Sequence, residues 1–284
     1  MTATSLPASD AAALASGKGH RDENFPVASF LLKPAHRPPV MAFYRFARAA
    51  DDVSDNEAAS DADKLAVLGA MRASLNGTSE ADPASTALRG VLAAHGLTAQ
   101  HGLDLLTAFE RDCTQRRYAS WDELIDYCRY SAMPVGRFVL DVHGEDRATW
   151  PANDALCAAL QVINHLQDCA KDYRALDRVY LPLDMMAAAG ASVEELAAPA
   201  ASPALRSVIV AMARRTQALL AESACFAAQI RSRRLALEVA VIQRLAESLT
   251  RRLLTRDPLS GRVHHGKAEA ALIAARAALG QLRP

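Results

Sequence analysis

Apolar residues recur every three to four positions along most of this chain, which is typical of helices with one buried face. The clearest example covers about residues 152–175, where Leu156, Leu160, Ile163 and Leu166 follow helical spacing. No stretch of useful length alternates apolar and polar residues as a half-buried strand does. The pattern therefore predicts an all-α protein, a multi-helix bundle.

Proline, glycine and capping residues divide this pattern into further helices. One helix begins near Pro39 and runs to about residue 55, and Asp61 is expected to cap the next one. A Ser120-x-x-Glu123 capping box starts a later helix, which Pro134 and Gly136 must kink. The other predicted helices cover about residues 62–75, 83–95, 98–117, 203–230, 233–256 and 267–281, with short helical pieces over 183–200.

Composition describes an ordinary globular protein with a sizeable core: 284 residues, 51% hydrophobic and 23% charged. Residues 1–21 lack the pattern of a signal peptide and are expected to be a disordered leader, and 22–284 a single domain. Lys plus Arg and Asp plus Glu both number 32, so the formal net charge is zero. This balance gives no support for binding nucleic acid.

Five cysteines, never spaced as CxxC, favour a reducing cytoplasmic location over a disulfide framework or a zinc site. Cys128, Cys157 and Cys169 lie among apolar residues and are interpreted as core residues. No run of about 18 apolar residues indicates a membrane span.

Polar residues interrupt the apolar 152–175 helix at Asn164, Asp168 and Asp172, which stand four apart. At ~100° per residue these side chains fall within an arc of roughly 80° on one helix face. Buried carboxylates need partners, because an unpaired buried charge is costly. The spacing thus predicts a functional polar face.

A matching cluster lies near the N-terminus. Taking Tyr44 as the reference, Arg48, Asp51 and Asp55 fall within an arc of roughly 60°, with Asp52 at its edge. Each cluster contains a DxxxD pair, and we expect both to face a shared cavity. Hard oxygen ligands without His or Cys suit Mg²⁺, which bridges carboxylates to substrate phosphates.

Other motifs are weaker or missing. No GxGxxG, GxxxxGK[ST] or GxSxG occurs, so the sequence supports neither a Rossmann site, a P-loop nor a hydrolase elbow. His165 points about 100° away from Asn164 and is interpreted as a core or supporting histidine. His264-His265-Gly266-Lys267 lies on a loop, and two interpretations stay open: a surface segment, or one that closes over substrate.

Taken together, the motifs resemble those of the squalene/phytoene synthase family over about residues 22–255. The resemblance implies an isoprenoid synthase fold and Mg²⁺-dependent ionisation of a prenyl diphosphate. The residues that carry it are Tyr44, Arg48, Asp51, Asp52 and Asp55; Tyr127, Cys128, Ser131, Ala132, Pro134, Val135 and Gly136; and Asn164, Gln167, Asp168, Asp172, Arg178, Tyr180, Leu181 and Pro182.

The resemblance also implies roles for these residues. Tyr44, Arg48 and Arg37 match positions near the diphosphate, and Tyr127 with the Ser131–Gly136 kink matches the lining of the central cavity. Ser131, Val135, Gly136, Arg178 and Tyr180 are expected to contact substrate, and Tyr44, Arg48, Tyr127 and Gln167 to take part in catalysis. Mg²⁺–diphosphate is expected to be held by Asp51, Asp52, Asp55, Asn164, Asp168 and Asp172.

Within the family, the segment Glu23–Ser29 and the Asn-His-x-Gln-Asp motif resemble the bacterial hopanoid-pathway branch. That branch implies conversion of presqualene diphosphate and water to hydroxysqualene and diphosphate, with no nicotinamide. Two positions depart from the usual family pattern: Gln167 replaces an Arg, and Pro134 replaces a Gly. Gln167 is expected to help hold the attacking water.

Two other functions stay open. One is head-to-head condensation of farnesyl or geranylgeranyl diphosphate to squalene, phytoene or dehydrosqualene. The other is a non-catalytic assembly protein, against which the intact aspartates of both clusters argue. The hydrophobic substrate implies peripheral contact with the inner membrane and transfer of product to other hopanoid-pathway enzymes.

Overall fold

The structure, a computed structural model, describes residues 33–281. The predicted leader and the Glu23–Ser29 segment lie outside these residues. The all-α prediction is confirmed, since β structure within residues 33–281 is limited to one bridge between Arg117 and Val179. The chain forms two compact units, one ending at Gln115 and the other beginning at Arg116. The single domain expected over 22–284 stays a prediction.

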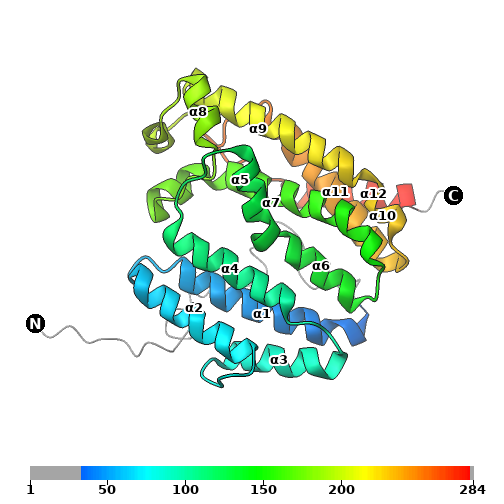
Figure 1. Cartoon of the computed structure of the whole chain (residues 1–284). Coiled ribbons are helices and arrows are strands. Elements are labelled where there is room, and N and C mark those ends of the chain that lie inside the picture. Colours follow the sequence, from blue (N-terminus) through cyan, green and yellow to red (C-terminus); the bar gives the residue numbers. More distant parts are fainter. Residues whose placement is uncertain (1–32, 282–284) are drawn as a thin grey trace, which may run out of the picture. The chain divides into compact units, whose positions relative to one another are not determined.

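The described part of the N-terminal unit, residues 33–115, contains four α-helices: α1 (Arg37–Ser54), α2 (Asp61–Leu75), α3 (Pro83–His95) and α4 (Gln100–Thr114). Helix α1 contacts the other three, and α2 contacts α3 and α4 (Figure 1). Their shared core is almost completely shielded from solvent. It includes Phe46, Leu68, Met71, Leu88, Leu105 and Leu106.

Helix ends in this unit follow capping rules. The N-cap of α2 is Ser60, one residue before the predicted Asp61, because its hydroxyl accepts a hydrogen bond from the Asp63 amide at 3.2 Å. Asp82 caps α3 in the same way, and Gly96 ends α3 with a φ of 64°, which glycine adopts without strain.

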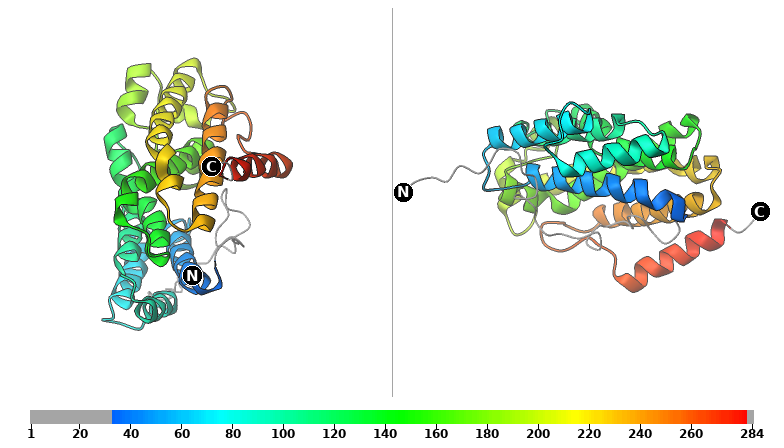
Figure 2. Two further views of the ribbon diagram at one scale, coloured as in Figure 1. Left: turned by 90° about the vertical axis from the view of Figure 1, so that its right-hand side faces the viewer. Right: turned by 90° about the horizontal axis from the view of Figure 1, so that it is seen from below.

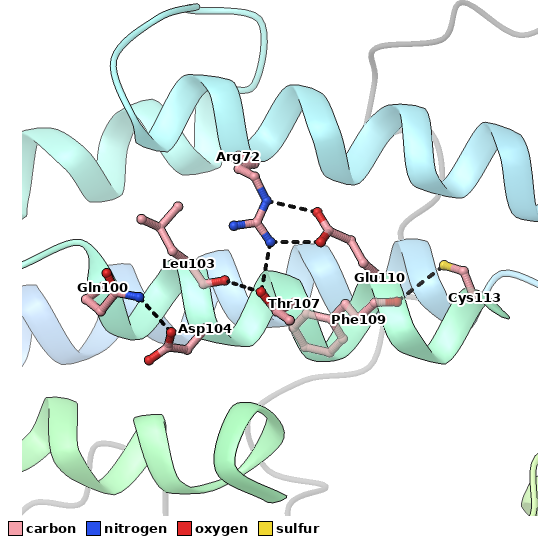
Figure 3. Close-up of polar contacts among 8 residues, drawn as sticks. All are labelled: Arg72, Gln100, Leu103, Asp104, Thr107, Phe109, Glu110 and Cys113. Carbon is pink, nitrogen blue, oxygen red and sulfur yellow. Dashed lines mark hydrogen bonds and ion pairs between the residues drawn. The ribbon is translucent and has the colours of Figure 1, made fainter. Parts of the chain in front are cut away.

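An ion pair joins α2 to α4 in this unit (Figure 3). Arg72 donates from Nε and Nη2 to the two carboxylate oxygens of Glu110, at 3.0 and 2.8 Å, and from Nη2 to Thr107 Oγ1 at 3.1 Å. Thr107 in turn donates to the Leu103 carbonyl. The planar guanidinium therefore fixes how α4 lies on α2.

The C-terminal unit is organised around α7 (Trp150–Leu176), which contacts α5 (Trp121–Ser131), α6 (Met133–Val142), α9 (Pro203–Glu222) and α11 (Arg233–Leu253). Helix α12 (Lys267–Gln281) contacts α11 and projects from it (Figure 2). The short helices α8 (Leu183–Ala189) and α10 (Phe226–Gln229) complete the unit. None of the helices in residues 33–281 is long and apolar enough to cross a membrane.

The predicted kink near Pro134 is a complete break. Helix α5 ends at Ser131, Ala132 leaves helical geometry with φ −123° and ψ −47°, and α6 begins at Met133. Gly136 then lies so close to α7 that a Cβ added there would be 2.0 Å from Asn153 Oδ1 and 2.7 Å from Cys157 Sγ. Glycine at this position therefore permits the close crossing of α6 and α7.

Candidate active site

The first acidic cluster lies at the end of α1 and includes an internal counter-ion. Arg48 pairs with Asp51 at 2.8 Å and with Asp52 at 2.9 Å. The Asp52 side chain is buried, whereas that of Asp51 is 34% exposed. Asp55 follows directly as the C-cap residue of α1. Three carboxylates thus gather near one guanidinium, so negative charge is in excess among these four side chains.

The pKa of Asp51 is raised to about 7 in these surroundings. The largest cause is the loss of hydration, followed by the charge of Asp55; Asp52 and Asp112 also raise the pKa, and Arg48 lowers it. Asp112, a buried residue of α4, was not found by sequence reasoning. Its place beside α1 arises from helix packing, which helical spacing along a single element does not reveal.

Tyr44 and Arg37 lie nearer the start of α1. Tyr44 is half-buried and precedes Arg48 by one helical turn, while Arg37 is the exposed first residue. The structure thus places Tyr44, Arg48, Asp51 and Asp55 on neighbouring turns of one helix, as the sequence predicts.

The second polar cluster lies on α7. Asn164, Asp168 and Asp172 are partly exposed. The residues around them on the helix are buried: Ile163, 165–167, Cys169 and Ala170. The three oxygen-bearing side chains therefore share one accessible face of an otherwise buried stretch of helix, as their spacing predicts.

The loop after α7 is fixed by the segment before α5. Asp177 ends α7 in the left-handed conformation, with a φ of 51°, and its carboxylate pairs with Arg117 at 2.6 Å. The Val179 amide donates to the Arg116 carbonyl at 2.9 Å, and the Arg178 amide donates to the Asp172 carbonyl at 3.2 Å. These bonds place the predicted residues Arg178 and Tyr180, both buried, beside the end of α7.

Four rings gather next to this loop. Tyr180 stacks on His165, with ring centroids 3.5 Å apart, and lies 5.6 Å from Tyr127 and 5.5 Å from Tyr118. Burial, followed by the charge of Arg178, lowers the pKa of His165 to about 3, so the imidazole is neutral at physiological pH. Its Nε2 is buried without a hydrogen-bond partner in the described part of the chain. Sequence reasoning found Tyr127 and Tyr180 but not their contact with Tyr118 and His165.

Gln167 is buried, and its amide Nε2 donates to the carbonyl of Val263. Residues 254–266, between α11 and α12, therefore lie against α7 at this point. We call this segment the C-terminal strap. The pKa of His264, a residue of this strap, is lowered, mainly by burial and then by the charge of Arg262. Asp168 is near enough to act in the opposite direction and raise that pKa. No motif in the sequence indicated this contact.

The residues at the α5–α6 break have different environments. The Ser131 hydroxyl is buried without a partner within residues 33–281, whereas Val135 is 42% exposed. Gly136 faces α7, as described above. The role of these three residues toward a substrate stays a prediction.

Neither cluster is a ready-made cage for a cation. Among residues 33–281, no group of three or more His, Cys, Asp or Glu side chains is arranged to hold a metal ion directly. The donors that gather are carboxylate and amide oxygens, and the raised pKa of Asp51 indicates local negative charge that a cation would relieve. This donor set fits Mg²⁺, which binds through one or two carboxylates, waters and substrate phosphates.

Comparison with known proteins agrees with this geometry. The chain is 60% identical to a hydroxysqualene synthase of Zymomonas mobilis subsp. mobilis over 96% of this chain and 93% of that protein. It is 56% identical to a hydroxysqualene synthase of Rhodopseudomonas palustris, over 89% and 87% of the two chains. The crystal structure of squalene synthase HpnC from Alicyclobacillus acidocaldarius superposes with a TM-score of 0.71 at 33% identity, covering 85% of this chain and 90% of that one.

The likeness to that crystal structure confirms the isoprenoid synthase fold expected from the sequence. A family model described as "Squalene/phytoene synthase" matches residues 19–269, which contain both acidic clusters, the aromatic rings and the strap. The chain belongs to the squalene/phytoene synthase family.

Proposed function

We propose that this enzyme converts presqualene diphosphate and water to hydroxysqualene and diphosphate, with Mg²⁺ bound at its acidic clusters. The observation that carries the proposal is the 60% identity to a hydroxysqualene synthase over almost the whole chain. The Asn164, Asp168 and Asp172 face of α7 supports it, because it offers a cation oxygen ligands at an accessible surface.

In this proposal Asp51, Asp52 and Asp55 of α1 are Mg²⁺ ligands of the N-terminal unit, and Asn164, Asp168 and Asp172 of α7 are Mg²⁺ ligands of the C-terminal unit. When bound, Mg²⁺ neutralises the charge that develops on the departing diphosphate. Asp51 and Asp52 both pair with Arg48, so each has the arginine as a partner besides the proposed cation.

The basic and aromatic residues act on the two parts of the substrate. Arg48, with Arg37 and Tyr44, donates hydrogen bonds to phosphate oxygens, and Arg178 adds positive charge near the end of α7. The carbon–oxygen bond to diphosphate breaks and leaves a carbocation. The ring faces of Tyr127 and Tyr180 each stabilise such a cation by about 0.5–2 kcal/mol, and Ser131, Val135 and Gly136 border the hydrocarbon.

Water then completes the reaction. Its oxygen forms the new bond to carbon, and one proton leaves the resulting oxonium group. No carbon is reduced in this sequence, so the proposal includes no nicotinamide.

We also propose peripheral contact with the cytoplasmic face of the inner membrane and transfer of the product to other hopanoid-pathway enzymes. The hydrophobicity of the substrate supports this, and so do Leu272 and Leu279 of α12, which are 52% and 63% exposed. Five free cysteines are in keeping with a reducing compartment.

The test is product analysis by gas chromatography–mass spectrometry. Purified protein with Mg²⁺ receives either presqualene diphosphate or farnesyl diphosphate, with and without NADPH. We expect hydroxysqualene from presqualene diphosphate alone, in the absence of NADPH. Squalene, phytoene or dehydrosqualene made directly from a simple prenyl diphosphate would instead assign a condensing synthase.

Two variants connect the activity to the clusters. Asp168→Asn should lose at least a hundredfold in turnover, because it removes charge next to the proposed cation. Asp122→Asn, an exposed aspartate in the first turn of α5, is the matched control and should turn over normally. Equal activity of the two variants would mean that the Asp168 carboxylate of α7 is not needed for the reaction.

A further inference from the structure

The C-terminal strap, residues 254–266, is held at several points along its length. Asp257 accepts a hydrogen bond from the Ala201 amide at 2.9 Å, and the buried Val263 carbonyl accepts one from Gln167. Arg252 donates to the His264 carbonyl at 2.6 Å, and the His265 ring meets Ser248 Oγ at 3.0 Å. The backbone around His264 is therefore fixed on both sides.

The imidazole of His264 is the exception in this network. Its ring makes no hydrogen bond to any residue between 33 and 281, and its Nδ1 is buried without a partner. Such a group is costly to leave unsatisfied in a fixed segment, and it commonly indicates a ligand that is not present.

One bond limits where this imidazole can lie. Gln167 holds Val263, so the backbone at His264 follows a residue that is anchored on α7, one position before Asp168. The Asp168 carboxylate is near enough for its charge to act on the ring. His264 thus lies near Asp168, which the proposed function assigns to the binding of Mg²⁺–diphosphate.

From this geometry we propose that His264 binds a phosphate oxygen of the diphosphate group, and that Gln167 is a positioning residue that places His264 by holding Val263. The inference rests on the proposed function for the identity of its ligand. An imidazole N–H donates to a phosphate oxygen whether the ring is neutral or charged, so the role needs no change of protonation.

This assignment gives the Gln167 position a physical reason. A glutamine amide is uncharged, and it donates to a backbone carbonyl without adding positive charge next to Asp168. The bond to Val263 involves one N–H of the Gln167 amide, and the water-holding role expected from the sequence stays a prediction.

The experiment measures binding of inorganic diphosphate in the presence of Mg²⁺ by isothermal titration calorimetry, which needs no turnover. His264→Ala should weaken binding about tenfold, the effect of one hydrogen bond to a charged group. His264→Asn, whose amide can place an N–H donor near the position of Nδ1, should remain within about threefold of the unchanged protein. Ser260→Ala, at an exposed position of the same strap that is not one of its anchoring residues, is the matched control and should bind normally.

Gln167→Met separates positioning from direct contact. It should weaken diphosphate binding to a similar degree and speed amide hydrogen exchange in residues 259–266, because the strap loses its bond to α7. The double variant with His264→Ala should bind no more weakly than His264→Ala alone. This readout stands even if presqualene diphosphate proves not to be the substrate.

Three results would overturn the proposal. The first is normal diphosphate binding by His264→Ala. The second is an equal loss in Ser260→Ala, which would make the effect one of the strap and not of His264. The third is an additive loss in the double variant, which would mean that Gln167 contacts the ligand itself.

Discussion

The raised pKa of Asp51 predicts that divalent-cation binding depends on pH in a narrow range. With a pKa of about 7, this carboxyl is roughly 90% protonated at pH 6 and roughly 10% at pH 8. A cation must displace that proton, so its affinity should be about tenfold lower at pH 6 than at pH 8. Binding should release close to one proton at the lower pH.

The same shift affects folding in a definite direction. A carboxyl whose pKa rises on folding, here from 3.8 to about 7, stabilises the folded protein below pH 4. That contribution is lost as the pH rises through 7, because the folded state must then carry a charge that its surroundings disfavour. Added Mg²⁺ should therefore raise the melting temperature more at pH 8 than at pH 6.

Two measurements check this reasoning. Free Mn²⁺, a probe that carboxylates bind like Mg²⁺, is followed by electron paramagnetic resonance at pH 6, 7 and 8. Calorimetry in two buffers of different ionisation enthalpy counts the protons released.

Variants of the neighbouring charges should shift the midpoint of this pH dependence in opposite directions. Arg48→Gln should raise it, because Arg48 lowers the pKa of Asp51, and Asp112→Asn should lower it. Asp51→Asn should remove the dependence altogether. If Mn²⁺ affinity were the same at pH 6 and pH 8, or if the dependence persisted in Asp51→Asn, the assignment of charge to this cluster would be wrong.

Three predictions concern packing and stability. Gly136→Ala should lower the free energy of unfolding in urea by about 1–3 kcal/mol, since the new methyl group meets Asn153. Gly69→Ala, which has open space around it, should not destabilise the protein. Equal effects of the two changes would contradict the close α6–α7 contact. Glu145→Ala should lower the free energy of unfolding by about 2–3 kcal/mol, because the buried carboxylate accepts hydrogen bonds from the Arg231 and Ser232 amides at 2.8 Å. Glu145→Gln should lower it less. A melting temperature unchanged in both variants would refute this prediction. Glu110→Ala should lower the free energy of unfolding by at most about 1 kcal/mol, and by less in 1 M salt, because its pair with Arg72 is partly solvated. A larger loss that does not depend on salt would mean that the pair is effectively buried.

Local rules were sufficient for most of the helices. Proline at the first turn of α1, the Ser120 cap of α5 and Gly96 after α3 fix helix ends through bonds between near neighbours in sequence. The α5–α6 break was more complete than the expected kink. The 203–230 helix divides into α9, a 3₁₀ turn at Ser223–Cys225 and α10, although no proline or glycine marks the division.

The candidate site was predicted to the extent that it lies on single helices. Four-residue spacing was enough to place Asn164, Asp168 and Asp172 on one face of α7. Asp112 beside Asp51, His165 stacked on Tyr180 and His264 beside Asp168 all depend on contacts between segments far apart in sequence. No periodicity encodes such contacts, because they are set by how helices and loops pack.

The five cysteines have a practical consequence for spectroscopy. Cys113, Cys128 and Cys169 are buried, and burial raises the pKa of Cys157 and of Cys169 to about 12 and that of Cys128 still further. Their thiolates are therefore scarce at neutral pH, and alkylating reagents act on thiolates. Cys225, at the junction of α9 and α10, is exposed. A maleimide dye added to the native, unmutated enzyme should label this position first and provide a single fluorescent reporter on the C-terminal unit.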